Sequence, residues 1–195
     1  MRDTKKLIQA EILNQLRWRP VEGIRVTEVA RAIGINRVTF YRYYDSVFSV
    51  VQDVEDSFFV TFGERVRKIM ATYEAEGEAG EATLNQIDLA LQDLACWKSD
   101  LATLFSSNGD RNFVNKLLRH LREDSLGVVG SLVTEGASKE LASSFVAWGW
   151  FGLVHDWALG KTNMSDDEFR EQTIQLVRFA APASGYNGGH GYSFL

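Results

Sequence analysis

The residues whose types and spacing suggest chemistry lie in one stretch, INRVTFYRYYD, at positions 35–45. It contains two arginines, three tyrosines and one phenylalanine. Arginine can donate two hydrogen bonds to a guanine edge or bind a phosphate, and a tyrosine hydroxyl can donate to a phosphate oxygen. These side chains suit a polyanion such as nucleic acid, although a hydrophobic core would use the same aromatic residues.

Patterns typical of catalytic or metal sites are missing from the sequence. The three histidines, His120, His155 and His190, are far apart and lack metal-ligand spacing. The sequence contains no Walker loop, no GxSxG and no GxGxxG motif. We therefore expect neither catalysis nor a metal or other cofactor.

The elements that position these residues are predicted to be helices throughout. Apolar residues recur at helical spacing along the chain, and strand-like alternation is scarce, so we expect an all-α protein. Helices are predicted at about residues 4–18, 28–33, 37–43 and 46–73, after Thr83, and at 100–105, 111–134, 138–159 and 166–180. The polar run at 74–82 is predicted to be a loop, and a Ser165–Glu168 capping box to start the final helix.

Local stop and start signals predict a helix-turn-helix around Gly34. Thr27 offers its hydroxyl as the N-cap of the first short helix, Gly34 ends that helix, and Asn36 caps the next. Backbone amides left free near Thr27 and Asn36 would provide two sites for phosphate.

The second of these helices should have two different faces. Phe40 and Tyr44 lie four residues apart, so both can pack on Val29 and Ile33 of the preceding helix. The opposite face then presents Arg37, Val38, Thr39, Tyr41, Arg42 and Tyr43. On this face an arginine could read guanine, and the apolar groups of Val38 and Thr39 could meet a thymine methyl.

Charge is distributed unevenly along the chain, whose net charge is −5. Residues 1–47 contain nine lysines and arginines against five acidic residues, whereas the remainder contains twelve against twenty-one. A basic amino-terminal quarter on an acidic body is compatible with binding to nucleic acid.

The sequence gives no sign of export or of membrane insertion. Charges are scattered through the amino terminus, unlike a signal peptide, and the most apolar window, FVAWGWFGLVHDWAL, is too short to span a bilayer. Cys96 is the only cysteine, so no disulfide can form within the chain. We expect a cytoplasmic protein.

The segment TEVARAIGINRVTFYRYYDS resembles the DNA-binding signature of TetR-type transcriptional regulators. The resemblance covers residues 4–50 and rests on Thr27, Ala30, Gly34, Thr39 and the Phe40–Tyr41 pair. It implies a helix-turn-helix DNA-binding domain at 1–46 and a helical regulatory and dimerisation domain at 47–181. The glycine-rich segment 182–195 is expected to be a flexible tail.

The resemblance also implies which residues contact a palindromic double-stranded operator. The helix after Asn36 would enter the major groove. The positions carried over as DNA contacts, with Asn36 at the helix start, are Thr27, Arg37, Val38, Thr39, Tyr41, Arg42 and Tyr43.

Two departures from the family pattern suggest weaker DNA binding. Relatives usually carry a phosphate-binding lysine where this chain has Val47, and often a basic residue near Asp45. Fewer phosphate contacts predict a shallower salt dependence, which Lys5, Lys6, Arg37 and Arg42 would partly offset. Glu28 is also expected to face the phosphates, which is mildly unfavourable.

The carboxy-terminal segment AWGWFGLVHDWALGKTNMSDDEF is similar to that of one subgroup of the family. In the family the last two long helices of each subunit form a four-helix dimer interface. The residues expected there are Phe145, Trp148, Gly152, His155, Leu159, Phe169 and Leu176. The alternative is that helix 138–159 is buried within one subunit.

An apolar or aromatic effector would need a lining of apolar side chains. The residues proposed for it are Trp97, Leu101, Leu104, Phe105, Phe113, Leu117, Trp150, Phe151 and Val154. Aromatic residues at helical spacing also form ordinary protein cores, so both interpretations remain open.

Together these features predict a homodimeric repressor released from its operator by a small molecule. One alternative is a helical co-regulator that acts through protein contacts with weak or no operator binding. A second is a small-molecule-binding or catalytic helical bundle with a vestigial DNA-binding part. The separation of the two third helices in a dimer distinguishes them, because operator binding requires roughly 34–36 Å.

Overall fold

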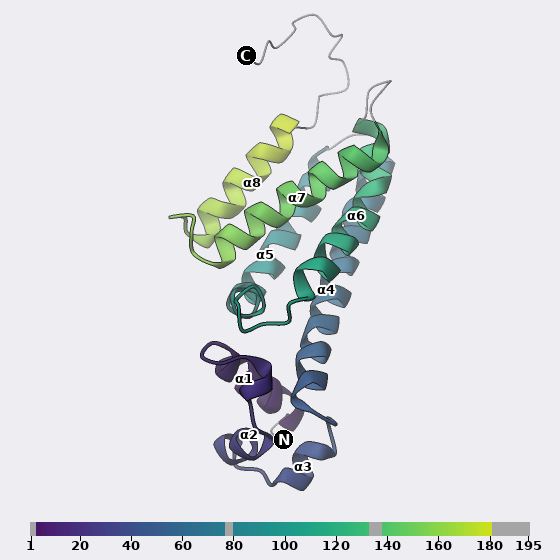
Figure 1. Ribbon diagram of the computed structural model, residues 1–195. Coiled ribbons are helices and arrows are strands. Elements are labelled where there is room, and N and C mark those ends of the chain that lie inside the picture. The colour runs from purple at the N-terminus through teal and green to yellow at the C-terminus, as the bar shows by residue number, and fades with distance from the viewer. Residues whose placement is uncertain (1–2, 77–79, 133–137, 181–195) are drawn as a thin grey trace, which may run out of the picture.

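The computed structural model describes residues 3–76, 80–132 and 138–180, and every regular element in these ranges is a helix. Figure 1 shows two parts: three short helices at one end, which we call the head, and five longer helices above them, the body. The prediction of an all-α fold is confirmed. The predicted flexible tail, residues 182–195, lies outside the described residues.

The head consists of α1 (Thr4–Leu16), a 3-10 turn (Val21–Gly23), α2 (Val26–Ile33) and α3 (Arg37–Tyr41). Helix α1 begins where the Asp3 side chain accepts a hydrogen bond from the Lys6 amide. It ends before Pro20, a residue type that breaks helices. Its buried side chains, Ile8, Ile12 and Leu16, face α2 and the start of α4 (Val47–Glu76).

Helix α4 (Val47–Glu76) leaves the head and runs the length of the body (Figure 1). It starts as predicted, because the Ser49 amide donates to Ser46 Oγ at 3.1 Å and the Ser46 amide donates to Ser49 Oγ at 3.0 Å. An apolar stripe of this helix is buried over Val47, Val50, Val51, Val54 and Phe58. Helix α4 therefore joins the core of the head to that of the body.

Two predicted boundaries near α5 (Glu81–Leu104) are wrong. Thr83 lies inside this helix and is not its cap, because Glu76 at the end of α4 accepts hydrogen bonds from the Ala82 and Thr83 amides at 3.0 and 2.9 Å. Residues 100–105 do not form a separate helix, since α5 continues to Leu104 with Leu101 and Leu104 buried. The predicted loop at 74–82 is correspondingly shorter.

The remaining helices are α6 (Phe113–Leu132), α7 (Lys139–Ala158) and α8 (Asp166–Ala180). Ser138 caps α7, and the predicted capping box starts α8: the Ser165 amide donates to Glu168 at 2.7 Å, and the Glu168 amide donates to Ser165 Oγ at 3.2 Å. Helix α7 packs on α6, and α8 packs on α5. One apolar cluster runs from Ile8 in the head to Phe169 in the body.

Candidate nucleic-acid interface

The turn between α2 and α3 is set by Gly34 and Asn36, as predicted. Gly34 has a φ of 73°, a left-handed conformation that favours glycine, and its amide donates back to Ala30 and Arg31. The Asn36 side chain then accepts a hydrogen bond from the Thr39 amide at 2.7 Å and starts α3. Local sequence therefore fixes the angle at which α3 is presented.

Thr27 does not have the predicted capping role. Helix α2 begins at Val26, its cap residue is Arg25, and no side chain caps it. Val26 packs against the apolar core, and the helix begins two residues earlier than Thr27 as its cap would place it. Thr27 is therefore an exposed residue of the first helical turn.

The inward face of α3 matches the prediction. Phe40 is fully buried and Tyr44 nearly so, with ring centroids 6.2 Å apart. They belong to the same apolar cluster as Val29, and Ile33 packs against it. This small core holds α3 on the head.

Helix α3 lies at the end of the head that is away from the body (Figure 1). Val38 is 71% exposed, and Thr39 is half-buried. The other predicted contact residues, all exposed, are Thr27, Asn36, Arg37, Tyr41, Arg42 and Tyr43. The structure thus brings the predicted residues of α3 together on one accessible surface.

Two side-chain contacts order this outward face. Arg37 Nη2 donates to Tyr41 Oη at 3.2 Å, and the guanidinium carbon lies 5.2 Å from the centre of the tyrosine ring. The Thr39 hydroxyl donates to Asn36 Oδ1 at 2.9 Å. Arg37 and Thr39 therefore have defined orientations on the exposed surface.

Charges around the head differ from the expectation in two respects. Glu28 forms an ion pair with Arg19 at 2.6 Å, which offsets the unfavourable charge that the sequence placed near phosphate. Lys5 forms an ion pair with Asp53 on α4 at 3.0 Å, so it is engaged within the protein. Among the described residues of the head, the exposed cations without an ion pair are Lys6, Arg17, Arg25, Arg31, Arg37 and Arg42.

Val47 is a core residue of α4 with 6% of its surface exposed. The position at which relatives usually carry a phosphate-binding lysine therefore contributes to packing in this chain. The next residue, Phe48, is 54% exposed. A lysine at Val47 would lose core contacts unless its ammonium group extended out of the core.

Asp53 joins the head to α4, a role that the sequence did not reveal. It accepts hydrogen bonds from Tyr44 Oη at 2.6 Å, Gln9 Nε2 at 2.7 Å and Lys5 Nζ at 3.1 Å. Burial opposes its ionisation, but the bonds from Tyr44 and Lys5 hold the pKa of Asp53 below its usual value. Burial and the bond to Asp53 raise the pKa of the Tyr44 hydroxyl.

A second contact joins the head to α5. Arg17 Nη2, just after α1, donates to Ser99 Oγ at 2.6 Å. Burial raises the pKa of the neighbouring Asp100, and the charge of Arg17 acts in the opposite direction. The head is therefore attached to the body at α4 and at α5.

A partly buried charge cluster lies between α4 and α6. Lys116 Nζ donates to Glu55 at 2.6 Å and to Asp110 at 3.0 Å. The Glu55 side chain is buried, and burial raises its pKa despite the hydrogen bond from Lys116. The sequence contains one sign of this cluster: Glu55 is a charged residue within the apolar stripe of α4, between Val54 and Phe58.

The residues proposed for an effector site all join the core of the body. Leu101, Leu104, Phe113 and Leu117 are buried, and the half-buried members that pack against them are Trp97, Phe105, Trp150, Phe151 and Val154. The Phe105 ring lies 5.5 Å from that of Phe113 and 5.8 Å from that of Phe151. They form a continuous aromatic cluster from α5 to α6 and α7, and their role as an effector site stays a prediction.

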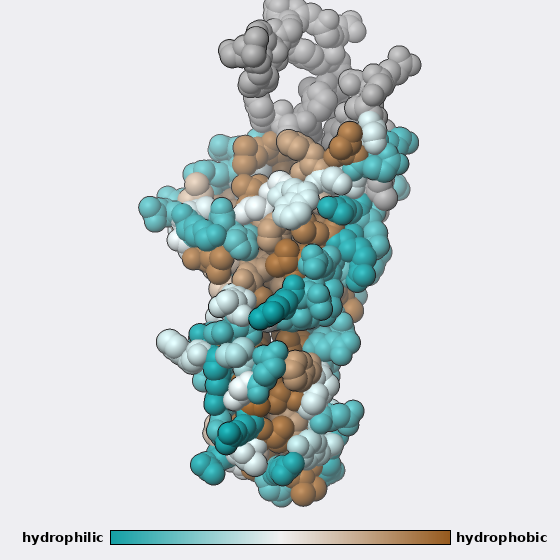
Figure 2. All heavy atoms as spheres, in the orientation of Figure 1, coloured by the Kyte–Doolittle hydropathy of each residue, from teal (hydrophilic) through white to brown (hydrophobic). Residues whose placement is uncertain are grey.

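An exposed apolar stripe marks α7. Leu141, Phe145 and Trp148 follow one another at intervals of four and three residues and are 73%, 82% and 51% exposed. Figure 2 shows apolar side chains gathered over α7 on the near face of the body. Among the other residues expected at the interface, Leu176 of α8 is 52% exposed, and Gly152, His155 and Leu159 are half-buried.

Phe169 does not lie on this exposed face. It is 5% exposed and stacks on Trp157 of its own subunit, with ring centroids 4.7 Å apart. Trp157 is the largest fully buried side chain of the described residues, so Phe169 completes the α7–α8 core. The single chain thus already buries Phe169, and its expected place at the dimer interface stays a prediction.

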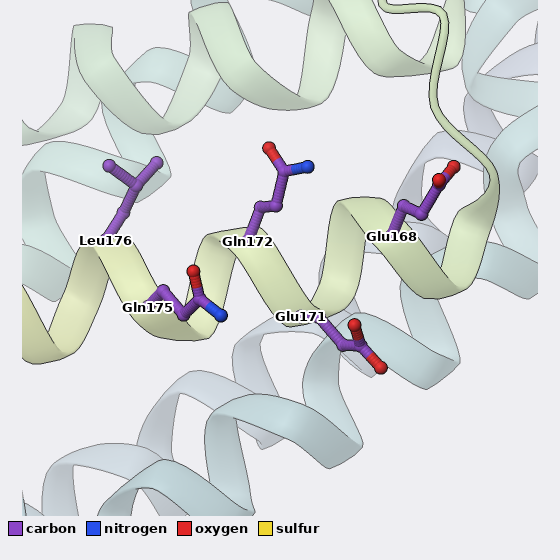
Figure 3. A pocket seen from close by; sticks show the side chains of 5 residues that line it. All are labelled: Glu168, Glu171, Gln172, Gln175 and Leu176. Carbon is purple, nitrogen blue, oxygen red and sulfur yellow. The ribbon is translucent and has the colours of Figure 1, made fainter.

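Helix α8 has a shallow, open hollow of about 480 Å³ beside it. Figure 3 shows Glu168, Gln172 and Leu176 extending from one side of the helix and Glu171 and Gln175 from the other. These five side chains recur at helical spacing, so the hollow follows the outer surface of α8.

Comparison with known proteins agrees with this architecture. Residues 98–179 match the TetR carboxy-terminal family described as the transcriptional regulator C-terminal region. Residues 98–179, less than half of the chain, therefore form a TetR-type carboxy-terminal region. The whole chain also shares its fold with Thermus thermophilus FadR, a TetR-family transcriptional repressor solved in complex with lauroyl-CoA. The two are 20% identical with a TM-score of 0.53, covering 96% of this chain and 100% of FadR. A comparison with curated proteins found no significant match.

Two further features concern the described residues. In the ranges that the structure describes, no helix is long and apolar enough to cross a membrane. Across those same ranges, no three His, Cys, Asp or Glu side chains come together in an arrangement able to hold a metal ion.

Proposed function

We propose that this protein is a homodimeric TetR-type repressor that binds a palindromic operator through α3. The observation that carries the proposal is the division of α3 into two faces. Phe40 and Tyr44 fix the helix to the head, while Arg37 and Val38 remain exposed at the end of the molecule. An exposed helix held in this way fits the major groove, where arginine reads guanine and an aliphatic group meets a thymine methyl.

Phosphate contacts would come from cations around the head. Arg25, Arg31 and Arg42 are exposed, and Tyr43 offers an exposed hydroxyl just after α3. Each neutralised phosphate should make the logarithm of the binding constant fall by about 0.9 per decade of salt. Because Lys5 is paired and Val47 is buried, we propose only a few such contacts and a shallow salt dependence.

A second copy of the chain is the proposed partner of the α7 stripe. Its three exposed side chains form an apolar surface that a matching helix would cover. A helix of the second copy could approach α7 closely, because a Cβ added at Gly149 or Gly152 would meet no atom within 4 Å. A two-fold axis would place the α7 and α8 of both subunits in one four-helix interface.

Release from DNA would follow from an apolar or aromatic effector acting on the body. FadR was solved in complex with lauroyl-CoA, a ligand that has an apolar acyl chain and a charged CoA group. In this chain the aromatic cluster of α5, α6 and α7 contacts α4 where Phe58 and Phe113 lie 5.9 Å apart. An effector that favoured another arrangement of α4 would move the head, because Asp53 fixes the head to α4.

One observation favours an alternative, a co-regulator that acts through protein contacts. The engaged Lys5 and the buried Val47 reduce the cations available to DNA, and the body is acidic. Such a protein would retain the fold and the dimer but bind operator DNA weakly or not at all.

The two functions are separated by selecting bound fragments from random DNA and measuring their affinity by gel shift. We expect the wild type to enrich a palindrome and Arg37→Ala to weaken its binding about fivefold or more, since each bidentate base contact contributes about 1–3 kcal/mol. Arg67→Ala, which removes an exposed arginine of α4, is the control and should bind like the wild type. Failure of the wild type to enrich any sequence would favour the co-regulator.

A further inference from the structure

Arg37 is held in place on the outward face of α3 before any DNA is present. Its Nη2 donates to Tyr41 Oη at 3.2 Å, and its guanidinium carbon lies 5.2 Å from the centre of the Tyr41 ring. Arg42, also exposed, has no such partner among the described residues. The two arginines of α3 are therefore unequal, because only Arg37 has a fixed orientation.

Tyr41 can fix Arg37 because it is itself anchored in the head. Its ring meets that of Phe40 edge-on, with centroids 5.6 Å apart and the planes at 83°. Phe40 is fully buried in the core that joins α2 to α3. The buried Phe40 therefore restrains the Tyr41 ring, and Tyr41 in turn restrains the exposed guanidinium group of Arg37.

The contact with Tyr41 leaves Arg37 able to read a base. A guanidinium group has five N–H donors, and one of them is used by the tyrosine. The remaining donors can form two parallel hydrogen bonds to O6 and N7 of guanine. The tyrosine oxygen accepts from Arg37, so its own hydrogen remains available to a phosphate oxygen.

We propose that Tyr41 is a positioning residue that directs Arg37 to a guanine in each half-site. In the complex the Tyr41 hydroxyl would accept a hydrogen bond from Arg37 and donate one to a phosphate oxygen. Tyr41 would thereby link recognition of the base to binding of the DNA backbone. The inference rests on the proposed operator binding and adds the chemistry of the operator. A fixed Arg37 also loses less side-chain entropy on binding than a free arginine would.

The neighbouring side chains specify what lies beside the guanine. Val38 is 71% exposed and follows Arg37 directly, so it presents an aliphatic group to the adjacent base pair. The hydroxyl hydrogen of Thr39 is engaged by Asn36 Oδ1 at 2.9 Å, which leaves its methyl group for contact. Each half-site should therefore contain a guanine next to a thymine, whose methyl group suits an apolar contact.

The test compares two DNA duplexes across four proteins. The duplexes are the operator selected by the wild type and the same operator with the guanine pair replaced by A·T. The proteins are the wild type, Tyr41→Phe, Arg37→Ala and the double variant. Fluorescence anisotropy gives each Kd, and the ratio of the two Kd values measures discrimination at that base pair.

We expect the wild type to discriminate roughly tenfold or more, and Arg37→Ala to lose the discrimination. Tyr41→Phe keeps the ring but removes the hydroxyl, so its discrimination should fall about fivefold, the effect of one hydrogen bond. In the Arg37→Ala background, Tyr41→Phe should leave the ratio unchanged, since no arginine remains to be positioned.

Tyr43→Phe is the matched control, because Tyr43 is similarly exposed just after α3 and has no described contact with Arg37. It should weaken both duplexes equally. If Tyr41→Phe did the same, Tyr41 would be a phosphate contact alone and the inference would be overturned. Full discrimination by Arg37→Ala, or a selected operator without a guanine, would also overturn it while leaving operator binding intact. Absence of any wild-type binding would overturn both proposals.

Discussion

Asp53 shows how much one side chain contributes to the junction between the head and α4. Asparagine at this position would lose the charge that pairs with Lys5 and one of the two oxygens that accept hydrogen bonds. We expect Asp53→Asn to lower the free energy of unfolding by about 1–2 kcal/mol, measured by urea denaturation at pH 7. Asp56→Asn, an exposed change on the same helix, should alter it by less than about 0.5 kcal/mol.

The effect of Asp53 should also depend on pH. Because its folded pKa lies below the usual value, its contribution is present above the unfolded pKa and is lost as the pH falls through the lower folded pKa. The stability difference between the wild type and Asp53→Asn should therefore shrink below about pH 4. An undiminished difference in acidic urea titrations would contradict the ion pair as its source.

At the scale of elements, Lys116 holds α4 against α6 through charge. Its removal leaves Glu55 buried without a counter-charge, so Lys116→Met should cost about 3–5 kcal/mol in chemical denaturation. Glu55→Gln should cost less, because Lys116 retains Asp110 at 3.0 Å.

The double variant Glu55→Gln/Lys116→Met separates charge from packing in this cluster. It removes the isolated carboxylate, so it should be more stable than Lys116→Met alone. Burial already raises the pKa of Glu55, and protonation of that group relieves the same penalty. The loss in Lys116→Met should therefore diminish as the pH falls. Equal losses in the single and double variants would show that packing dominates.

Element boundaries were predictable where the cap comes from the same short segment. Asn36, Gly34 and the Ser165–Glu168 pair act within three or four residues, and each was recognised in the sequence. Thr27 and Thr83 were misassigned because distant groups decide those helix starts. The core beside Val26 extends α2, and Glu76 supplies the acceptors that start α5.

The same limit applies to the candidate site. The two faces of α3 follow from spacing within one helix, so the inward Phe40 and the outward Arg37 were predicted correctly. The partners of Asp53 lie 44 and 48 residues away in Gln9 and Lys5, a separation over which local pattern carries no information. Long-range polar contacts of this kind needed the structure.

At the scale of the whole molecule, the α7 stripe should determine the oligomeric state. Phe145 is 82% exposed, and an aspartate there would place a charge in the proposed interface. We expect Phe145→Asp to be monomeric in sedimentation velocity under conditions in which the wild type is a dimer. Val60→Asp, a change at a 62% exposed position of α4, is the control and should remain dimeric. A dimeric Phe145→Asp would place the interface elsewhere.

The symmetry of the selected operator tests the central claim most directly, because it requires both the exposed α3 and the dimer. Purified wild-type protein should enrich fragments from random DNA that contain two inverted half-sites about 10–10.5 base pairs apart, or a multiple of that spacing. Titration of the enriched fragment should show one dimer bound per site. Enrichment of no sequence, or of an unpaired half-site bound by a single protomer, would contradict the account.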